Sequence, residues 1–369
     1  MSVALPAHPS PAHELLVANG GWWTSEDDFA YYRDYGDIHA EYKAVREDVV
    51  AWDVSGTHSF VWEGPQAAAA AQAVFSNDIL NCPVGLGRYG AILDRNGNVL
   101  DDPIAFKHSD EFVHMTMSVP HWNDYFQQMI KGFDATVRFA TLEYPHVQVQ
   151  GPNSRKLLQT LTDFDMESLK WFRFTTERVP VAGVDVIVTR TGPTAELGYE
   201  LHYPRPDGLK LFTALVDAGA TLCGHDCMIK MIKPETGAIC FGVDYVPGER
   251  TPFDLGMDTC VAINKPVEFA GKSRLASLAK APPHRLISLS FASEDLPDWG
   301  SKVMVDGYDI GDMTVSTTTP LFGALGQAII ETDFASPGTR VEVVDGDRVF
   351  PATVGERVLY DPERIRVRS

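Results

Sequence analysis

The sequence lacks the long apolar run and the basic clusters on which membrane and nucleic-acid proteins depend. No stretch approaches the roughly 18 to 20 apolar residues that span a bilayer, and the N-terminal segment has no basic region followed by an apolar one. Positive charge is also scarce, since 31 Lys and Arg stand against 50 Asp and Glu, a formal charge of −19. Nucleic acids and anionic membranes attract basic surfaces, so we expect neither as a partner. With no targeting or membrane-spanning segment in the sequence, we expect a cytoplasmic location.

Cysteine pairs and nucleotide-binding motifs are equally sparse. The five cysteines are odd in number and scattered, which is typical of reduced thiols rather than of a disulfide framework. Cys223-Gly-His-Asp-Cys227 has no second ligand pair at a suitable distance, so we predict no metal site. No GxGxxG, P-loop or GxSxG motif occurs, which leaves nucleotide-binding and serine-hydrolase functions without support.

What is present is a mixture of short strands and helices, followed by a region of strands alone. The chain has 369 residues, 44% of them hydrophobic, which is enough for two or three domains with a large core. From residue 284 onward short apolar runs alternate with turn signals such as Asp306-Gly307 and Asp345-Gly346. Pro282-Pro283 should end the preceding helix, so we expect a boundary near residues 279–283.

One pattern occurs twice in the first part of the chain. Residues 60–67 read Phe-Val-Trp-Glu-Gly-Pro-Gln-Ala, and residues 147–154 read Val-Gln-Val-Gln-Gly-Pro-Asn-Ser. Both predict a strand, a Gly-Pro turn and a helix, because proline suits the first helical turn. Two related halves would explain the repeat, and so would coincidence, since Gly-Pro commonly follows a strand.

An acidic pair, Asp101-Asp102, lies in an otherwise apolar segment. Asn96-Gly97 between two apolar runs predicts a hairpin with strands near residues 89–93 and 99–106. Strand alternation places Asp102 on the apolar face and Asp101 on the other. A carboxylate on an apolar face needs a partner or a ligand, and burial raises its pKa. Asp102 is therefore either a catalytic or ligand-orienting acid or a core aspartate bonded within the protein.

A second acid, Glu200, lies between Tyr199 and Leu201 in a strand that follows a Gly/Pro loop. A bidentate carboxylate beside an aromatic wall suits a heterocycle with an N–C–N donor edge, such as a pterin or guanine. An exposed glutamate would give the same pattern. Lys233 and Arg250 are local cations that an anionic ligand would need in so acidic a protein, and surface charges beside a turn would look the same.

Several segments, each unspecific alone, stand in one order along the chain. They are Trp52-Asp-Val-Ser55, Gly97-Asn-Val-Leu-Asp-Asp102, Gly198-Tyr-Glu200, Glu235-Thr-Gly237, Phe241-Gly-Val-Asp244, Val305-Asp-Gly307 and Tyr360-Asp-Pro362. Together they resemble the glycine-cleavage T-protein (aminomethyltransferase) family of tetrahydrofolate-dependent one-carbon transferases, including its demethylase branches. The resemblance extends over nearly the whole chain.

The resemblance implies an α+β fold of three domains in a ring around a central folate channel. Two related α/β halves and a C-terminal β-barrel would form the ring. The folate-binding region would span residues 1–278, with residues 54–140 inserted between 1–53 and 141–278, and the barrel would span residues 284–369. Tetrahydrofolate is the implied cofactor.

The resemblance also assigns roles to individual residues. Asp102 would lie beside the reacting nitrogen of the folate as the catalytic residue, and Glu200 would bind the pterin edge. Tyr89 would line the pocket, and Tyr199 and Phe172 are further expected cofactor-binding side chains.

The sequence departs from the family pattern at three places. Lys233 stands where the family usually has an arginine for the glutamate tail of folate, and a lysine loses the bidentate fork. Residues 192–196 read Gly-Pro-Thr-Ala-Glu instead of Gly-Tyr-Thr-Gly-Glu, and Val119-Pro120 replaces Asn-Ala. These departures argue against a lipoyl-bearing carrier protein as partner.

The last two departures argue against the glycine-cleavage role, whereas the step Asp102-Pro103 and the segment Arg250-Thr-Pro-Phe-Asp-Leu-Gly256 resemble the demethylase branches of the family. We therefore expect methyl transfer from a small N-, O- or S-methylated donor to N5 of tetrahydrofolate. One alternative is aminomethyl transfer of the glycine-cleavage type. An alternative of another class is a non-catalytic folate-binding accessory protein, although residues 253–260 do not match the Lys-Gly-Cys-Tyr type motif of such relatives.

Overall fold

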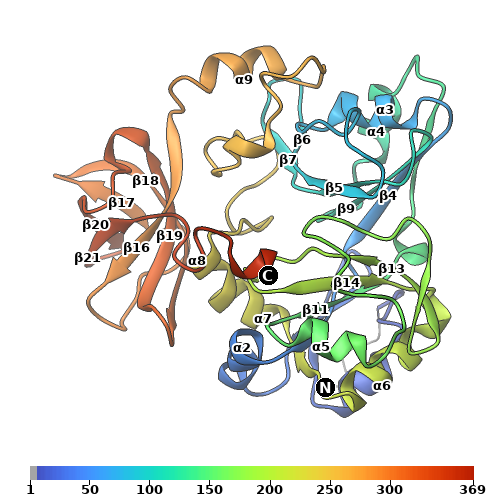
Figure 1. Ribbon diagram of the computed structural model, residues 1–369. Coiled ribbons are helices and arrows are strands. Elements are labelled where there is room, and N and C mark those ends of the chain that lie inside the picture. The colour runs from blue at the N-terminus through green and yellow to red at the C-terminus, as the bar shows by residue number, and fades with distance from the viewer. Residues whose placement is uncertain (1–5) are drawn as a thin grey trace.

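The computed structural model describes residues 6–369, which form two large open sheets, two small two-stranded sheets and a closed barrel. Figure 1 shows the barrel on one side and the two sheets stacked on the other, with the C-terminus lying between them. Among residues 6–369 no helix combines the length and the apolar character needed to cross a membrane. The arrangement is the α+β ring of three units that the family resemblance implied.

The first sheet has six strands in the order β12-β13-β14-β11-β3-β15. Its strands are β3 (Val50–Asp53), β11 (His146–Gln150), β12 (Val179–Val181), β13 (Val184–Thr189), β14 (Gly198–His202) and β15 (Thr221–Cys223). Helices α1 (His13–Ala18), α2 (Ile38–Glu47), α5 (Ser154–Gln159), α6 (Gly208–Asp217), α7 (His225–Cys227) and α8 (Lys233–Thr236) belong to this half, as does the hairpin of β1 (Trp22–Glu26) and β2 (Phe29–Asp34).

Strand alternation determines which residues of this sheet face the core and which face the opposite side. In β11, Val147 and Val149 point into the core beneath the helices, and in β14 Tyr199 and Leu201 do the same. The residues between them therefore point to the opposite face. That face turns Glu200 toward the rest of the molecule.

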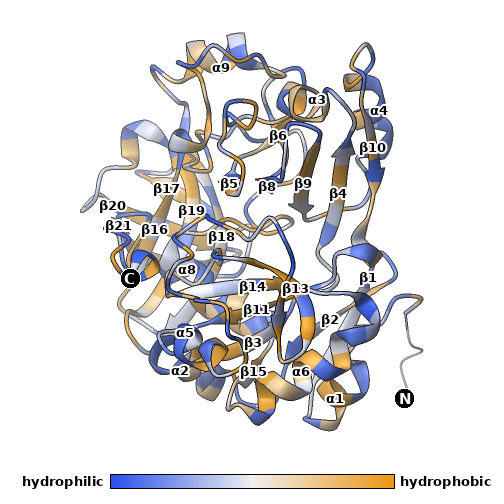
Figure 2. Cartoon of the chain, turned by 45° about the vertical axis from the view of Figure 1, so that its right-hand side comes forward, coloured by the Kyte–Doolittle hydropathy of each residue, from blue (hydrophilic) through white to orange (hydrophobic). Residues whose placement is uncertain are grey.

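The second sheet has five strands in the order β10-β4-β9-β8-β5, and every neighbouring pair is antiparallel. Its strands are β4 (His58–Glu63), β5 (Leu86–Tyr89), β8 (Ile104–Lys107), β9 (Phe112–Met117) and β10 (Thr136–Phe139), packed with α3 (Ala67–Val74) and α4 (Asn123–Met129). All five strands lie in one continuous segment of the chain between β3 and β11. These two strands pair with each other in the six-stranded sheet, so the five-stranded sheet is inserted between them. Figure 2 shows the hydrophobic residues gathered on strands such as β9 and on α3.

The repeated Gly-Pro pattern is confirmed in both halves. β4 leads through Gly64 into α3, and β11 leads through Gly151 into α5. Both glycines have a φ of 122°. A Cβ would lie 2.9 Å from the Asp134 carbonyl oxygen at the first glycine and 2.3 Å from the Asp48 carbonyl oxygen at the second. The same crossing of backbones thus recurs, which is what two related halves predict.

The predicted hairpin around Asn96-Gly97 is present but shorter than expected. β6 (Ile92–Leu93) pairs with β7 (Val99–Asp101), and Gly97 has a φ of 80° in the turn. The ladder stops at Asp102 because Pro103 has no N–H to donate. The chain then continues as β8, which pairs with β5.

The barrel closes in the order β16-β19-β18-β17-β20-β21. Its strands are β16 (His284–Phe291), β17 (Lys302–Val305), β18 (Tyr308–Thr319), β19 (Gly323–Glu331), β20 (Arg340–Asp345) and β21 (Arg348–Gly355), preceded by α9 (Lys272–Leu278). After β21 the chain leaves the barrel and returns toward the six-stranded sheet (Figure 1). The barrel therefore contributes its last segment, residues 356–369, to the centre of the molecule.

Candidate active site

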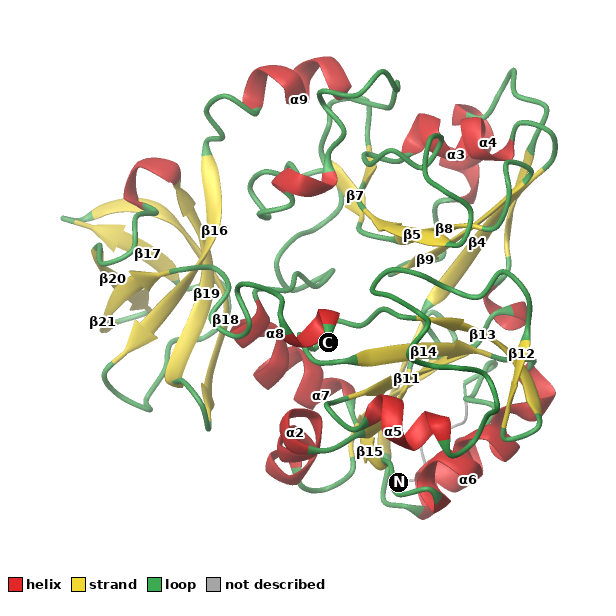
Figure 3. Ribbon diagram, viewed as in Figure 1, coloured by secondary structure: helices red, strands yellow, loops and turns green. Residues whose placement is uncertain are grey.

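A cavity of about 610 Å³ lies between the two sheets and the segment that follows the barrel. Its size falls within the range of small-molecule sites in proteins. Figure 3 shows the green loops that converge on this region from all three units. Residues from β5, β9, β11 and β14, from the loops around residues 237 and 257, and from residues 357–367 line it.

Asp102 lies in the cavity wall at the break between β7 and β8. Its Oδ2 accepts a hydrogen bond from the Tyr89 hydroxyl at 2.7 Å, and its Oδ1 accepts one from the Tyr245 hydroxyl. Burial, with a smaller contribution from Asp101, raises the pKa of Asp102 to about 7, although the two tyrosine hydrogen bonds oppose the shift. A carboxyl with this pKa can both hold and release a proton near neutral pH.

Asp101 points away from the cavity and is fully buried. Its side chain accepts hydrogen bonds from the backbone N–H groups of Asp102 (2.8 Å), Ser118 (3.0 Å) and Val119 (3.2 Å) and from Trp122 Nε1 (3.0 Å). Asp101 is thus a structural hydrogen-bond acceptor. It fixes the segment after β9 against the strand that carries Asp102.

Glu200 faces the cavity from the middle of β14 and is 3% exposed. Its Oε1 accepts a hydrogen bond from Gln148 Nε2 at 3.3 Å, and its Oε2 lies 3.9 Å from His146 Nε2. Burial raises the pKa of Glu200 to about 7, against a hydrogen bond from Thr191. Within residues 6–369, Gln148 Oε1 and His146 Nδ1 have no partner, so this corner of the cavity holds unsatisfied polar groups beside a carboxyl.

Phe172 lines the cavity in an unusual backbone conformation, with a φ of 62°. Two backbone hydrogen bonds hold it there: its N–H donates to the Arg190 carbonyl at 2.9 Å, and its carbonyl accepts from the Gly87 N–H at 2.7 Å. A non-glycine residue in this region costs on the order of 1 kcal/mol. The aromatic ring is thus placed at the wall by surrounding structure rather than by local preference.

Tyr199 and Lys233, two of the expected cofactor-binding residues, do not line the cavity. Tyr199 is fully buried in the core beneath the six-stranded sheet, where its hydroxyl donates to the Met166 carbonyl at 3.1 Å. It neighbours Glu200 in the strand and therefore points the other way. Its assignment as a folate contact is corrected.

Lys233 is 4% exposed and lies where α8 packs against the barrel. Its Nζ contacts Asp244 Oδ1 at 2.8 Å and Gln327 Oε1 at 2.5 Å. An ammonium group held by two internal partners joins the barrel to the first half of the molecule. The assignment of Lys233 to the folate tail is therefore corrected as well.

Residues that the sequence did not single out complete the site. Tyr245 donates to Asp102, and the only sequence signal near it is the segment Phe241-Gly-Val-Asp244 just before it. Arg357 and Arg364, both from the segment after the barrel, bring positive charge to the cavity. The guanidinium of Arg364 lies 5.6 Å from the centre of the Trp171 ring at the cavity wall.

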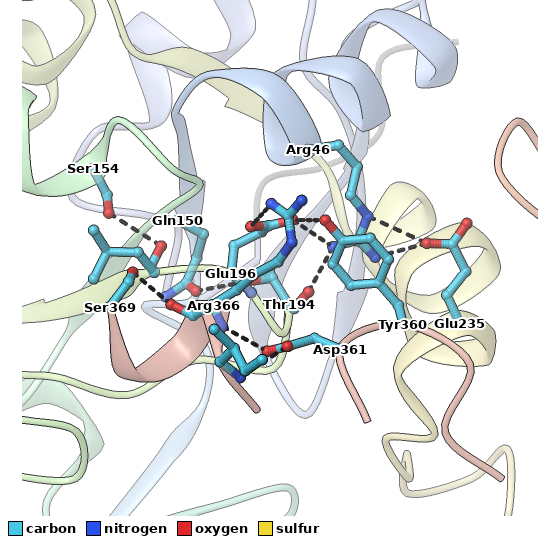
Figure 4. Close-up of polar contacts among 12 residues, drawn as sticks. Arg46, Gln150, Ser154, Thr194, Glu196, Glu235, Tyr360, Asp361, Arg366 and Ser369 are labelled. Carbon is cyan, nitrogen blue, oxygen red and sulfur yellow. Dashed lines mark hydrogen bonds and ion pairs between the residues drawn. The ribbon is translucent and has the colours of Figure 1, made fainter. Parts of the chain in front are cut away.

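A polar network fixes the returning segment in place (Figure 4). Glu196 accepts hydrogen bonds from the Tyr360 hydroxyl and, at 3.2 Å, from Arg366 Nη1. Arg46, 5% exposed, pairs with Glu196 at 3.3 Å and with the fully buried Glu235 at 2.7 Å. The network holds the loop at residues 192–196 against the returning segment, and both line the cavity.

The fold brings Glu41 to the Cys223/Cys227 pair, and one ligand atom from each of the three lies within 4.8 Å of the others. Both carboxylate oxygens of Glu41 already accept backbone hydrogen bonds, from Tyr35 N–H and Gly224 N–H at 2.8 Å each. The carboxylate is thus satisfied within the protein.

Two family models match this chain. Residues 12–265 match the GCVT N-terminal domain, and residues 284–361 match the glycine cleavage T-protein C-terminal barrel domain. Among solved structures, the glycine cleavage system aminomethyltransferase T from Bartonella henselae has the same fold, with a TM-score of 0.85 at 20% identity over 96% of this chain and 99% of that one.

Sequence relatives agree with the family models. An aminomethyltransferase of Listeria welshimeri is 29% identical over 95% of this chain and 97% of its own. An aminomethyltransferase of Streptomyces avermitilis is 32% identical over 84% of this chain and 86% of its own, and a probable aminomethyltransferase of Haloarcula marismortui is 31% identical over 98% and 96%. The chain belongs to the glycine cleavage T-protein family, whose cofactor is tetrahydrofolate.

Proposed function

We propose that this protein transfers a one-carbon unit to tetrahydrofolate held in the cavity, with Asp102 as the proton-handling residue. One observation carries the proposal: the half-buried carboxyl of Asp102 lies in the cavity wall, fixed by two tyrosine hydroxyls, with a pKa of about 7. A carboxyl that titrates near neutral pH adds little to the stability of the fold. A transfer reaction that moves a proton, in contrast, needs such a group.

The residues around the cavity fit tetrahydrofolate. Glu200, with the unsatisfied Gln148 Oε1 beside it, would bind the donor edge of the pterin. Tyr89 and Phe172 supply aromatic walls to the cavity that Glu200 and Asp102 also line. When bound, tetrahydrofolate supplies the nitrogen that accepts the one-carbon unit.

The chain's own groups would orient the reactants and manage the proton. Asp102 can accept a proton on a carboxylate oxygen while the hydroxyls of Tyr89 and Tyr245 keep its orientation fixed. Asp101 keeps the backbone beneath it rigid through the amides of Ser118 and Val119. Positioning and exclusion of water would then supply most of the acceleration.

The comparisons support an aminomethyl donor as the first candidate, because the relatives that cover this chain are named aminomethyltransferases. The transferred unit would then be methylene. Its release breaks the bond from the carbon to the carrier sulfur and the bond to the amine, and the two folate protons go to the thiolate and to ammonia. A lipoyl-bearing carrier would be the partner in that reaction.

A second candidate, methyl transfer from a small methylated donor, is favoured by residues at the wall. Pro193 and Ala195 line the cavity where the family usually has tyrosine and glycine, and Val119-Pro120 follow Ser118, which also lines it. In this reaction the bond from the methyl carbon to N, O or S breaks, and the folate proton goes to that heteroatom.

Product mass separates the two candidates. The purified protein would be incubated with tetrahydrofolate and either an aminomethyl-lipoyl carrier or small methylated donors. The expected product is 5,10-methylenetetrahydrofolate in the first case and 5-methyltetrahydrofolate in the second. Tetrahydrofolate should also raise Tm, since a ligand bound only by the native state stabilises it. Saturating folate without a Tm shift and without product would contradict the proposal.

A further inference from the structure

Arg357 places a cation in the cavity wall without an acidic partner. It follows β21 and reaches the cavity from the barrel side. In the described part of the chain its guanidinium donates a hydrogen bond from Nη1 to the Gly237 carbonyl at 2.8 Å and makes no ion pair. The other donors of its planar fork have no protein acceptor there.

Two glycines in the left-handed region make room for this side chain. At Gly256, with a φ of 69°, a Cβ would lie 2.7 Å from Arg357 Nε and 2.9 Å from Cζ. At Gly237, with a φ of 65°, a Cβ would lie 2.7 Å from the Arg357 carbonyl oxygen. The backbone therefore forms a cradle that holds the guanidinium in one place, and Gly256 also lines the cavity.

The acids near Arg357 are engaged elsewhere. Both carboxylate oxygens of Asp258 accept from Nη1 of Arg285, at 2.7 and 2.8 Å. Asp361, which also lines the cavity, accepts the backbone N–H groups of Ile365 and Arg366 at 2.8 and 3.0 Å. Arg357 is thus left to face the interior of the cavity.

The position of Arg357 relates it to the reacting end of the cavity. Arg357 lines the same cavity as Tyr89, whose hydroxyl donates to Asp102, whereas Arg364 is exposed and lies beside Trp171. A guanidinium fork matches a carboxylate through two parallel hydrogen bonds. A carboxylate that meets Arg357 would therefore belong to a molecule bound in the cavity that Asp102 also lines.

We propose that Arg357 is the carboxylate-binding residue of this cavity and that the one-carbon donor is a small molecule bearing a carboxylate. This inference rests on the proposed function and refines its substrate class. The other source of the same chemistry is the glutamate tail of folate. An aminomethyl-lipoyl arm has no carboxylate to offer, so the subsite favours the methylated small molecule.

Calorimetric binding with matched acids and amides tests the proposal. The probes are N,N-dimethylglycine, methoxyacetate and (methylthio)acetate, each with its amide, added to protein saturated with tetrahydrofolate. Wild type should bind at least one acid on the order of tenfold or more tightly than its amide. Arg357→Met should abolish the preference, and Arg357→Lys should retain part of it. Arg340→Met, an exposed arginine of β20, is the matched control and should change nothing.

The folate arm identifies the source of the carboxylate. Tetrahydrofolate and tetrahydropteroate, which lacks the glutamate, would be titrated into wild type and Arg357→Met. The proposal predicts that wild type and Arg357→Met bind tetrahydrofolate with the same affinity, and that the two also bind tetrahydropteroate with the same affinity. If Arg357→Met weakens only the binding of tetrahydrofolate, the carboxylate is that of the tail and the donor assignment is overturned. Equal acid and amide affinities in wild type, or a preference that survives Arg357→Met, also overturn it.

Gly256→Ala is a second variant that tests the proposal in case Arg357→Met does not fold. The binding of tetrahydrofolate by wild type distinguishes failure of the carboxylate subsite from failure of the proposed function. Gly256→Ala keeps the charge but displaces the guanidinium, and it should lose the acid preference as Arg357→Met does, with Tm reported for both. If wild type binds tetrahydrofolate while the Arg357 variants change nothing, only the present inference fails. If wild type does not bind tetrahydrofolate, the proposed function itself fails.

Discussion

The hydroxyl of Tyr245 donates a hydrogen bond to Oδ1 of Asp102, although 143 positions separate the two residues in the chain. Tyr89, only 13 positions away, holds the other oxygen of the same carboxylate. Asp102 is therefore clamped by one group from its own sheet and one from the loop that connects the first half to the barrel. The pKa of Asp102 therefore depends on the hydroxyls of both Tyr89 and Tyr245, and a variant of either tyrosine can test this dependence.

Tyr245→Phe should move the titration of Asp102 upward. The hydrogen bond from Tyr245 favours the charged carboxylate and opposes the effect of burial, so its loss raises the pKa further above about 7. The pH dependence of the single-turnover transfer rate should shift in the alkaline direction, by on the order of one pH unit. Tyr308→Phe, an exposed tyrosine of β18, should leave the profile unchanged, and an unshifted profile in Tyr245→Phe would show that the hydroxyl does not tune Asp102.

Glu200→Gln should weaken folate binding more than it slows transfer from the bound state. The carboxylate would bind two donors of the pterin edge, whereas an amide presents one acceptor and one donor group. A loss on the order of tenfold or more in the affinity for tetrahydrofolate is expected. Isothermal titration checks it, and unchanged affinity would remove Glu200 from the folate site.

Three histidines at the junction of the two sheets should make the fold sensitive to acid. His146 and His202 stack with ring centres 4.5 Å apart, and His114 of β9 meets His202 at 5.4 Å. All three are buried, and burial lowers their pKa values, to about 4 for His146. A lowered folded-state pKa means that stability is present above the unfolded value near 6.5 and is lost as the pH falls below it.

The measurement is Tm between pH 7.5 and pH 5. We expect Tm to fall as the pH drops below about 6.5, and the decline to be shallower in His202→Phe, which removes one buried base while keeping an aromatic ring. A solvent-exposed histidine provides the control: His39→Phe should leave the slope as in wild type. Identical slopes in His202→Phe and wild type would contradict this explanation.

Arg46→Met should destabilise the protein by about 3 kcal/mol, because it leaves the buried carboxylate of Glu235 without its cation. Lys43 lies in the same helix and pairs with Glu47 at 3.8 Å on the surface, with 71% and 67% of the two side chains exposed. Lys43→Met should cost less than about 1 kcal/mol. Denaturant unfolding gives the free energy of unfolding of both variants. If Arg46→Met and Lys43→Met lower it equally, the buried ion pairs of Arg46 stabilise the fold no more than a surface pair does.

Local rules of the chain predicted Asp102 and Glu200. Glu200 lies within β14 and Asp102 directly follows β7, so the alternation of both can be followed in the sequence, and a carboxylate between apolar neighbours needs a partner whatever the fold. The same rule excludes Tyr199, because a residue next to Glu200 points to the opposite face. Its assignment to the site came from the resemblance and from the aromatic side chain, and the geometry of the strand overrode both.

Tyr245, which bonds Asp102, and Arg357, which lines the cavity, could not be predicted from local patterns, because both lie outside regular strands and helices. A loop path has no period that could indicate which side chains face a ligand. Lys233 was misplaced for a related reason. Its partner Asp244 is 11 positions away, across an irregular segment, and only the folded structure shows that the ammonium group is satisfied inside the protein.

The central claim is that Asp102 handles the proton while a one-carbon unit passes to bound tetrahydrofolate. The most direct test compares wild type with Asp102→Asn in single-turnover reactions with tetrahydrofolate and a donor, with the folate product measured by mass. The account predicts a one-carbon folate from wild type, and from Asp102→Asn the same folate-dependent rise in Tm with a transfer rate lower by about 10²- to 10⁴-fold. An Asp102→Asn variant that transfers at the wild-type rate would contradict it.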